Sequence, residues 1–321
     1  MKIVVLDAAT LGMEDSAWEA LAKEADLELV PRTPYETGAI VARAKDADVV
    51  LSNKVPLGEA ELAGLPNLRL ISVLATGYNN VDLDAARSRG VTVCNVPAYS
   101  TASTAQHAVA LMLELCNQVG PHDRSVRDGD WVRSPDFAYW KRDLIELEGK
   151  TVGIVGFGRI GRRVGATVAA MGARVLASAR RHREPPDYPF AWEDTEAIFE
   201  QADFVSLHCP QTDENLEFVN AALLRRMKPD AFLINTARGS LINEGDLARA
   251  LREGRPAGAA VDVLQREPMA EDCPLRDAPN CILTPHMAWS GRESRRRLLR
   301  ETVANVEAFV RGEPRNVVNP S

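Results

Sequence analysis

A predicted strand followed by three spaced glycines constrains the fold of this chain more than any other feature of its sequence. Thr151–Val155 (TVGIV) has the composition of a buried strand, and Gly156–Gly161 (GFGRIG) follows it directly and leads into a helical pattern. Glycines at this G-x-G-x-x-G spacing allow a tight turn, a close approach of the backbone to a pyrophosphate, and tight packing of the helix on the strand. The helix also offers its free N–H groups to the phosphates. The segment predicts a dinucleotide-binding βαβ unit, and a glycine-rich turn without a ligand is the alternative.

Short β-rich runs alternate with amphipathic stretches along the whole chain. This alternation predicts an α/β protein of two units in series, each a parallel sheet with helices on both faces, with a hinge near Pro97–Ser100. Pro121 is expected to end the long helix that begins at Thr101, and the aromatic-rich stretch Asp123–Glu148 is expected to form an arm or a cover. The predicted strands are Lys2–Asp7, Asp48–Ser52, Leu68–Leu74, Val91–Asn95, Thr151–Val155, Arg174–Ser178, Phe204–Leu207, Ala231–Asn235, Gly258–Val263 and Cys281–Leu283. The predicted helices are Ser16–Ala25, Asp82–Arg89, Thr101–Val119, Arg159–Met171, Ala221–Met227, Asn243–Glu253 and Ser290–Arg311.

The composition excludes several other classes of protein. The 321 residues suffice for two domains, and 45% apolar and 26% charged residues are ordinary for a globular chain. A net charge of −7 argues against general binding of nucleic acid or of an anionic membrane. Five cysteines without a C-x-x-C pair predict neither a disulfide framework nor a structural metal site. Because the N-terminus turns acidic at Asp7 and no apolar run reaches about 18 residues, we expect a soluble, cytoplasmic protein.

The second strand of the predicted dinucleotide unit bears on the choice of cofactor. A unit that binds NAD usually places Asp or Glu about 20 residues after the glycines, where it bonds the ribose 2′-hydroxyl. No Asp or Glu occurs between Gly149 and Arg183, and Arg180 and Arg181 lie just after the strand. Guanidinium groups suit a 2′-phosphate, so we expect NADP(H) to be preferred, with NAD(H) possible. A solvated basic loop is the alternative.

Three segments that follow predicted strands of the second unit carry the candidate catalytic residues. They are Asn235–Gly239 (NTARG), Asp262–Pro268 (DVLQREP) and Thr284–Trp289 (TPHMAW). Reduction of a 2-keto acid needs, besides hydride, a cation for the carboxylate and a proton donor for the developing alkoxide. Arg238 can supply the cation and His286 the proton, since the ordinary pKa of imidazole is about 6.5. Glu267, if paired with His286, would favour the protonated ring and fix its orientation.

Each of these three side chains also fits an ordinary structural role when it is considered alone. Arg238 fits a surface ion pair, Glu267 a solvated turn before a proline, and His286 a structural histidine. Their position in segments that follow predicted strands of the second unit is what favours the catalytic interpretation, because ligands of open α/β sheets bind at the carboxyl ends of the strands.

Taken together, these motifs resemble the D-isomer-specific 2-hydroxyacid dehydrogenase family over nearly the whole chain. The resemblance rests on the GFGRIG loop, Leu207–Pro210 (LHCP), and the three segments that end the predicted strands. It implies a nicotinamide-linked hydride transfer in which His286 is the acid/base, Glu267 its partner, and Arg238 the group that orients the substrate. It also implies a Rossmann nucleotide domain, residues 99–287, inserted into a flavodoxin-like substrate domain formed by residues 1–98 and 288–321, and a homodimer.

The resemblance also assigns ligand-binding residues. The expected cofactor-binding residues are Thr104, Gly156, Gly158, Arg159, Ile160, Gly161, Ser178, Arg180, Arg181, Cys209, Pro210, Thr236, Ala237 and Asp262, of which Asp262 resembles the residue near the nicotinamide carboxamide. The expected substrate-binding residues are Ala75, Thr76, Gly77, Arg238, His286 and Trp289. A plain strand–helix turn is the alternative for residues 75–77, and a core side chain is the alternative for Trp289.

Within the family, three segments look most like those of glycerate dehydrogenases, also called hydroxypyruvate reductases. They are Leu74–Asp82, Asn95–Gln106 and His286–Trp289. We therefore expect reduction of hydroxypyruvate or glyoxylate by NADPH. The alternatives are an NAD-dependent dehydrogenase of another substrate (D-lactate, phosphoglycerate, phosphite or formate) and a non-catalytic, corepressor-like NAD(H)-binding protein. The end of the chain at Ser321, without an appended sensor domain, weakens the phosphoglycerate alternative.

Overall fold

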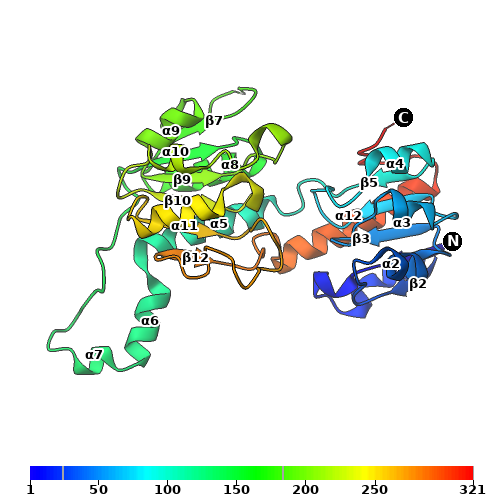
Figure 1. Ribbon diagram of the computed structural model, residues 1–321, viewed down its shortest axis with the longest axis horizontal. Coiled ribbons are helices and arrows are strands. Elements are labelled where there is room, and N and C mark those ends of the chain that lie inside the picture. The colour runs from blue at the N-terminus through cyan, green and yellow to red at the C-terminus, as the bar shows by residue number, and fades with distance from the viewer. Residues whose placement is uncertain (24, 183, 321) are drawn as a thin grey trace. The chain divides into compact units, whose positions relative to one another are not determined.

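The computed structural model describes residues 1–23, 25–182 and 184–320. The chain divides into two compact units, Met1–Ser100 with Ser290–Ser321, and Thr101–Trp289. The second unit is thus inserted into the first, and Figure 1 shows the blue and red parts of the chain in one unit. The predicted domain boundaries, after residues 98 and 287, each lie two residues before these divisions.

The first unit is built on a five-stranded parallel sheet with the order β2-β1-β3-β4-β5. This is the flavodoxin-like strand order that the sequence predicts. The strands are β1 (Lys2–Val5), β2 (Asp26–Leu29), β3 (Val49–Ser52), β4 (Leu70–Val73) and β5 (Thr92–Cys94). The helices are α1 (Glu19–Ala22), α2 (Thr37–Ala44), α3 (Glu59–Ala63), α4 (Leu83–Ser88) and α12 (Arg292–Val310), with the 3-10 turns η1 (Ala8–Leu11) and η2 (Asp15–Trp18).

The second unit is built on a seven-stranded parallel sheet with the order β12-β11-β10-β9-β6-β7-β8. The strands are β6 (Thr151–Val155), β7 (Arg174–Ser178), β8 (Phe190–Trp192), β9 (Phe204–Leu207), β10 (Phe232–Asn235), β11 (Gly258–Val261) and β12 (Cys281–Leu283). The helices are α5 (Thr101–Asn117), α6 (Val119–Arg127), α7 (Asp130–Arg133), α8 (Arg159–Ala170), α9 (Thr195–Gln201), α10 (Ala221–Leu224) and α11 (Glu244–Arg252), with η3 (Asp213–Asn215) and η4 (Gly239–Leu241). The strand order reverses between β6 and β9, and this doubly wound arrangement creates a ligand-binding crevice at the carboxyl ends of those strands.

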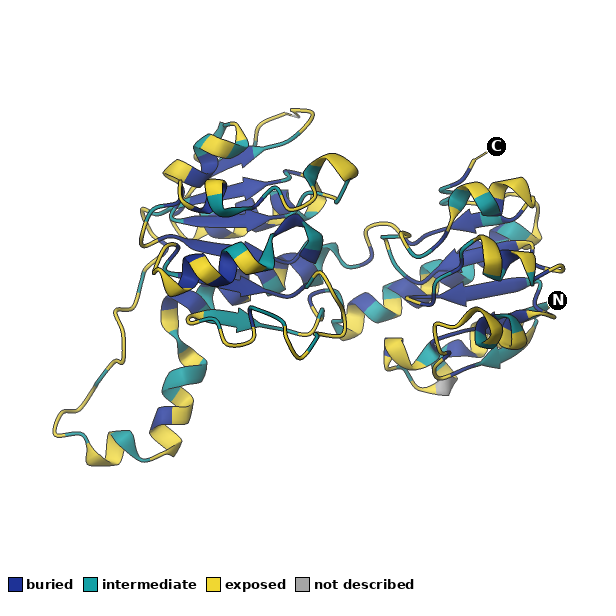
Figure 2. Cartoon of the chain, viewed as in Figure 1, coloured by how far each residue is buried: buried dark blue, intermediate teal, exposed yellow. Residues whose placement is uncertain are grey.

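Successive side chains of these strands enter separate hydrophobic cores on the two faces of the sheet. Leu233 packs in one core with residues of α9, α10 and α11, while its neighbour Ile234 packs in the other with residues of α5 and α8. Figure 2 shows that the inner strands of both sheets are buried, whereas the outer faces of the helices are exposed and the edge strands β2, β8 and β12 are only partly buried. The predicted α/β class with two parallel sheets is confirmed.

Several predicted elements differ from the structure. The helix predicted over Thr101–Val119 ends at Asn117, and Gln118 has a left-handed backbone (φ +50°) before α6 begins. Pro121 does not end a helix but lies in the first turn of α6, where a missing N–H costs no intrahelical hydrogen bond. The helix predicted over Ser16–Ala25 stops at Ala22, and its predicted range includes residue 24, which lies outside the described residues.

Over the residues that the structure describes, no helix combines the length and the apolar character that a bilayer-crossing segment needs.

Candidate functional site

The glycine loop after β6 is shaped by contacts that exclude side chains at two of its three glycines. Gly156 has φ +100°, and a Cβ there would lie 2.3 Å from the backbone nitrogen of Cys209. At Gly161 a Cβ would lie 2.4 Å from the Gly156 carbonyl oxygen, so α8 packs closely against the end of β6. A Cβ on Gly158 would have no heavy atom within 4 Å. Packing within the protein therefore does not explain Gly158, whereas a pyrophosphate approaching the backbone would.

Open space at Gly158 and an unpartnered hydroxyl at Thr236 together fit a bound dinucleotide. Thr236 follows β10, and its Oγ1 is buried without a hydrogen-bond partner among the described residues. A buried hydroxyl without a partner is costly, so a ligand atom there would satisfy it. The residues present therefore fit the nicotinamide dinucleotide that the glycine loop predicts.

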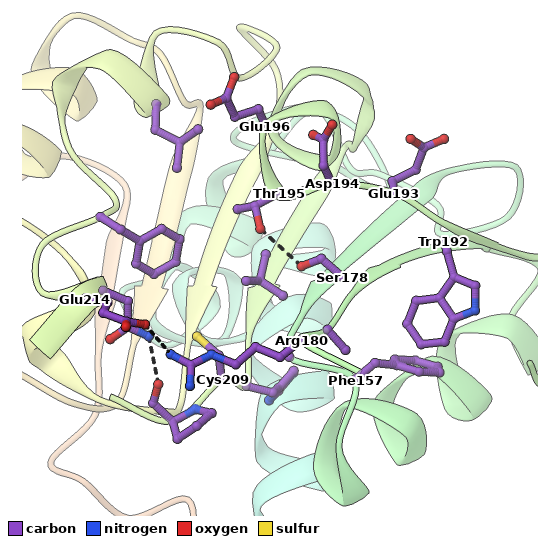
Figure 3. A pocket seen from close by; sticks show the side chains of 18 of the residues that line it. Phe157, Ser178, Arg180, Trp192, Glu193, Asp194, Thr195, Glu196, Cys209 and Glu214 are labelled. Carbon is purple, nitrogen blue, oxygen red and sulfur yellow. Dashed lines mark hydrogen bonds and ion pairs between the residues drawn. The ribbon is translucent and has the colours of Figure 1, made fainter. Parts of the chain in front are cut away.

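A pocket of about 1420 Å³ opens at the carboxyl ends of β6, β7 and β9 (Figure 3). The predicted cofactor residues that line it are Gly156, Gly158, Ser178, Arg180, Arg181, Cys209 and Pro210. The remaining predicted cofactor residues do not line this pocket: Thr104, Arg159, Ile160, Gly161, Thr236, Ala237 and Asp262. The basic stretch of the sequence extends to Arg183, which lies outside the described residues.

The pocket also contains side chains that the sequence analysis did not identify. Trp192, at the end of β8, stacks on the His182 ring with 4.2 Å between ring centroids. The acidic side chains that line the pocket are Glu193, Asp194, Glu196 and Glu214. Although the stretch from Gly149 to Arg183 has no acid, the fold brings carboxylates to the same pocket from the β8–α9 connection and from η3. The pair Glu193-Asp194 directly after Phe190–Trp192 is the available signal in the sequence, but its use depends on recognising β8 as a strand.

His286 and Glu267 form the closest imidazole–carboxylate pair of the second unit. His286 follows β12, and its Nδ1 lies 2.6 Å from Glu267 Oε2, with both side chains partly exposed. The other carboxylate oxygen of Glu267 accepts a hydrogen bond from the backbone N–H of Leu264 at 3.1 Å. The backbone of His286 is left-handed (φ +51°), which is rare for a residue with a side chain and occurs often at functional sites.

Asp262 holds the His286 loop in this conformation. Its side chain is completely buried at the end of β11, and its two oxygens accept the backbone N–H groups of Met287 and Ala288, both at 2.9 Å. Thr284 Oγ1 donates to Asp262 Oδ1 at 2.6 Å, and His107 on α5 lies 3.5 Å from the same oxygen. Burial alone would raise the pKa of Asp262, but the hydrogen bonds from His107, Thr284 and the two N–H groups lower it below its ordinary value. Asp262 therefore remains ionised and positions the loop.

Arg238 follows β10 in a loop that is fixed by a buried asparagine. Asn235 Nδ2 donates to the carbonyl oxygen of Arg238 at 2.8 Å, and Asn235 Oδ1 accepts from the N–H of Ala237 at 2.9 Å. Because β10, β11 and β12 are adjacent and parallel, Arg238, Glu267 and His286 all follow the same edge of the sheet. The sequence identified these three residues but missed Asn235 and His107, whose roles depend on tertiary contacts.

Another histidine beside the cofactor pocket is unsuited to donate a proton. His208 follows β9, and its Nε2 lies 2.9 Å from Ser206 Oγ. Loss of hydration lowers the pKa of His208 to about 4, so this ring stays neutral near pH 7. It therefore cannot carry the proton that reduction of a keto group requires.

The predicted substrate loop Ala75–Gly77 lies in the first unit, after β4. Asn95 Nδ2 donates to the carbonyl oxygen of Thr76 at 2.7 Å, and Thr76 Oγ1 donates to the carbonyl oxygen of Val96 at 2.9 Å. The loop is thereby tied to the segment after β5. Trp289, the last residue of the second unit, is partly buried.

A doubly wound unit with a glycine loop shaped for a dinucleotide, and an imidazole–carboxylate pair and an arginine along one sheet edge, is typical of a dinucleotide-dependent oxidoreductase. The sequence profile described as "D-isomer specific 2-hydroxyacid dehydrogenase, NAD binding domain" matches residues 109–288, more than half of the chain. The hydroxypyruvate reductase of Blautia hydrogenotrophica is 41% identical over 99% of this chain and 100% of its own length. The chain belongs to the D-isomer specific 2-hydroxyacid dehydrogenase family.

Solved structures of the family resemble this chain over its whole length. The NADPH-dependent glyoxylate/hydroxypyruvate reductase of Sinorhizobium meliloti superposes with a TM-score of 0.86 and 28% identity, covering 99% of this chain and 98% of its own. The D-lactate dehydrogenase of Aquifex aeolicus, solved with NAD and lactic acid, superposes with a TM-score of 0.84 and 28% identity, covering 100% of both chains. These findings confirm the family resemblance and the fold. The first of these relatives is named as NADPH-dependent, whereas the second was solved with NAD.

Proposed function

We propose that this protein reduces hydroxypyruvate or glyoxylate to the D-2-hydroxy acid or to glycolate, with NADPH as the hydride donor. The observation that carries the proposal is the 2.6 Å contact between His286 and Glu267 on the sheet edge that also carries Arg238. The relatives named hydroxypyruvate reductase and glyoxylate/hydroxypyruvate reductase support the substrate class. Arg180 and Arg181 in the pocket support the phosphorylated cofactor.

The geometry supports a proton transfer through His286. When bound, the nicotinamide supplies hydride to the keto carbon of the substrate. Because Nδ1 of His286 is engaged with Glu267, its Nε2 is the atom that would donate a proton to the keto oxygen. The Glu267 carboxylate fixes the orientation of the ring through its contact with Nδ1.

The substrate carboxylate needs a cation and N–H donors. We assign Arg238 as the cation, because its guanidinium remains charged and can form two parallel hydrogen bonds with a carboxylate. We assign the backbone N–H groups of Thr76 and Gly77 as additional donors. Trp289 remains a predicted wall of the substrate pocket.

A panel of substrates with both cofactors tests this function. We expect NADPH oxidation with hydroxypyruvate and glyoxylate at higher kcat/KM than with pyruvate or phenylpyruvate, because the chain most resembles reductases of the first two. We expect a higher kcat/KM with NADPH than with NADH, because Arg180 and Arg181 can bind a 2′-phosphate. Steady-state kinetics at fixed ionic strength measure both ratios, and a higher kcat/KM with NADH would contradict the cofactor assignment.

The same panel separates the alternatives. Preference for pyruvate would indicate a D-lactate type enzyme, and oxidation of phosphite or formate would indicate those dehydrogenases. Cofactor binding without turnover of any of these acids would favour the corepressor-like alternative, against which the paired His286 and Glu267 argue. A cytoplasmic location remains a prediction.

We also propose that the protein is a homodimer and that the arm formed by residues 119–146 contributes to its interface. The arm is braced from within, since Asp130 binds Ser125, Arg133 and Lys141, and these hydrogen bonds hold the pKa of Asp130 well below its ordinary value. Its large exposed apolar side chains are Val119, Val126, Trp131, Val132, Phe137, Trp140 and Leu144. An ordered arm with this much exposed apolar surface is typical of a protein interface.

A double substitution in the arm tests the dimer. Val132 and Phe137 are 88% and 93% exposed, so replacing both with aspartate should not disturb packing within the chain. We expect Val132→Asp with Phe137→Asp to convert a dimer into a monomer, measured by light scattering after size exclusion. Tyr35→Asp is the control, because Tyr35 is 61% exposed but lies in the other unit. A wild-type monomer, or a dimer that survives the double substitution, would contradict the proposal.

A further inference from the structure

The ion pair between Arg180 and Glu214 lies in the cofactor pocket and has no role in the proposed proton and hydride transfers. Arg180 follows β7, whereas Glu214 lies in η3 after β9, 34 residues further along the chain. Arg180 Nη2 donates to Glu214 Oε2 at 2.9 Å (Figure 3). The same nitrogen donates to Thr212 Oγ1 at 3.2 Å. The Glu214 carboxylate is thus paired with Arg180, one of the two arginines that the sequence assigns to a 2′-phosphate.

Glu214 is presented to Arg180 by a rigid turn. Asn215 Oδ1 accepts from the N–H of Thr212 at 2.7 Å, and Asn215 Nδ2 donates to the carbonyl oxygen of Pro210 at 2.8 Å. These bonds fix the turn beside Cys209 and Pro210 in the pocket wall. The position of Glu214 therefore follows from the backbone of the turn as well as from its attraction to Arg180.

Two of the other acids in the pocket are engaged elsewhere. Glu196 lies 3.1 Å from Arg226 Nη1, and Asp194 Oδ1 accepts the N–H of Ala197 at the start of α9. Arg181 has no ion pair within the described part of the chain. Of the two arginines after β7, Arg181 is therefore available to a phosphate, while Arg180 is held by Glu214.

We propose that Glu214 determines how strongly this protein discriminates between NADPH and NADH, because its carboxylate competes with the 2′-phosphate for Arg180. The inference rests on the proposed cofactor site, but it holds whichever cofactor the wild type prefers. A 2′-phosphate has about −1.5 to −2 charges at pH 7, and Arg180 can bind it fully only after leaving Glu214. NADH has no such group and does not require that exchange.

The substitution Glu214→Gln tests the competition. Glutamine keeps the length of the side chain and an oxygen that accepts from Arg180, but it removes the negative charge. The dissociation constants of NADPH and NADH are measured by calorimetry in wild type and variant. We expect NADPH to bind about two- to fivefold more tightly to the variant, since an exposed ion pair is weak, and NADH to change by less than about twofold. The gain in NADPH affinity should shrink at high ionic strength, where exposed charges are screened.

Two controls isolate the Arg180–Glu214 pair from a general change in charge. Asp213→Asn makes the same change in net charge one residue away, at an exposed side chain that does not line the pocket. We expect it to leave both dissociation constants unchanged. In an Arg180→Ala background, Glu214→Gln should no longer tighten NADPH binding, because the cation for which Glu214 and the 2′-phosphate compete has been removed.

Three outcomes would overturn the inference. The first is unchanged or weaker NADPH binding by the Glu214→Gln variant. The second is an equal gain in NADPH affinity in the Asp213→Asn control. The third is a loss of NADH affinity in Glu214→Gln alone, which would assign Glu214 to the ribose hydroxyls instead. The wild-type ratio of the two dissociation constants tests the proposed preference for NADPH separately. A wild type that binds NADH more tightly would contradict that preference, while the shift caused by Glu214→Gln would still test the competition.

Discussion

Replacing His286 with alanine should lower kcat for hydroxypyruvate or glyoxylate by about 10²- to 10⁴-fold, which is the usual contribution of a positioned general acid. The reason is that the variant has no side chain that can donate a proton to the keto oxygen, while Glu267 and the loop remain. Cofactor affinity should change little, because His286 does not line the pocket around the glycine loop. Stopped-flow or steady-state kinetics measure kcat, and calorimetry measures the dissociation constant of the cofactor.

The companion variant Glu267→Gln distinguishes a proton donor from a structural histidine. Glutamine preserves an oxygen that accepts from His286 Nδ1 but removes the carboxylate charge beside the ring, so kcat for reduction should fall while the KM for the keto acid changes little. A purely structural pair would change the thermal midpoint of unfolding and leave kcat unchanged. Turnover by His286→Ala near the wild-type rate would exclude the proposed role.

Strands whose sequence forms a short apolar run could be predicted. The bounds of β6, β7, β9 and β12 agree with the predicted ranges, although β12 is an edge strand with partly exposed side chains. By contrast, β2 and β8 were not predicted, because the Asp-Leu-Glu-Leu sequence of β2 has no apolar run and the three residues of β8 follow a proline-rich segment. The order of the strands could be inferred only from the family resemblance.

The residues of the candidate site also divide into those that the sequence predicts and those that only the structure reveals. Arg238, Glu267 and His286 could be proposed as site residues because each is a charged or titratable side chain in a short segment that follows a strand. Asp262 also stood out, but its bonds to the backbone of the His286 loop could not be predicted, because residues 287 and 288 come from a different strand end. Glu214 was not predicted, because an acid in the cofactor pocket was expected only in the stretch of sequence that follows the glycine loop. The Glu214 carboxylate instead reaches the pocket from the connection after β9. The hydrogen bonds of Asp262 and the position of Glu214 are both determined by contacts between segments that follow different strands. A local sequence pattern does not encode such contacts.

Gly239→Ala should be the most damaging small substitution at the catalytic edge of the sheet. Gly239 begins η4, directly after Arg238, and a Cβ there would lie 1.9 Å from the carbonyl carbon of Leu264 and 2.4 Å from the backbone nitrogen of Gln265. Because the clash is with backbone, the loop after β11 must move, and it includes the N–H of Leu264 that binds Glu267. Overpacking of this kind costs about 1–3 kcal/mol of stability, and a displacement of about 1 Å at a catalytic group can cost about 10²-fold in rate.

We therefore expect Gly239→Ala to lower the thermal midpoint by about 2–10 °C and kcat by about 10²-fold, with kcat measured well below the midpoint so that the protein is folded. Gly245→Ala is the matched control, because Gly245 lies in the first turn of α11 and the nearest atom to its Cβ would be 3.5 Å away. That change should leave kcat unchanged and should maintain or raise the midpoint, since alanine favours a helix over glycine. Retention of both the wild-type midpoint and the wild-type kcat by Gly239→Ala would contradict this prediction. The catalytic groups would then be held in place by something other than the close approach of the Arg238 and Glu267 loops.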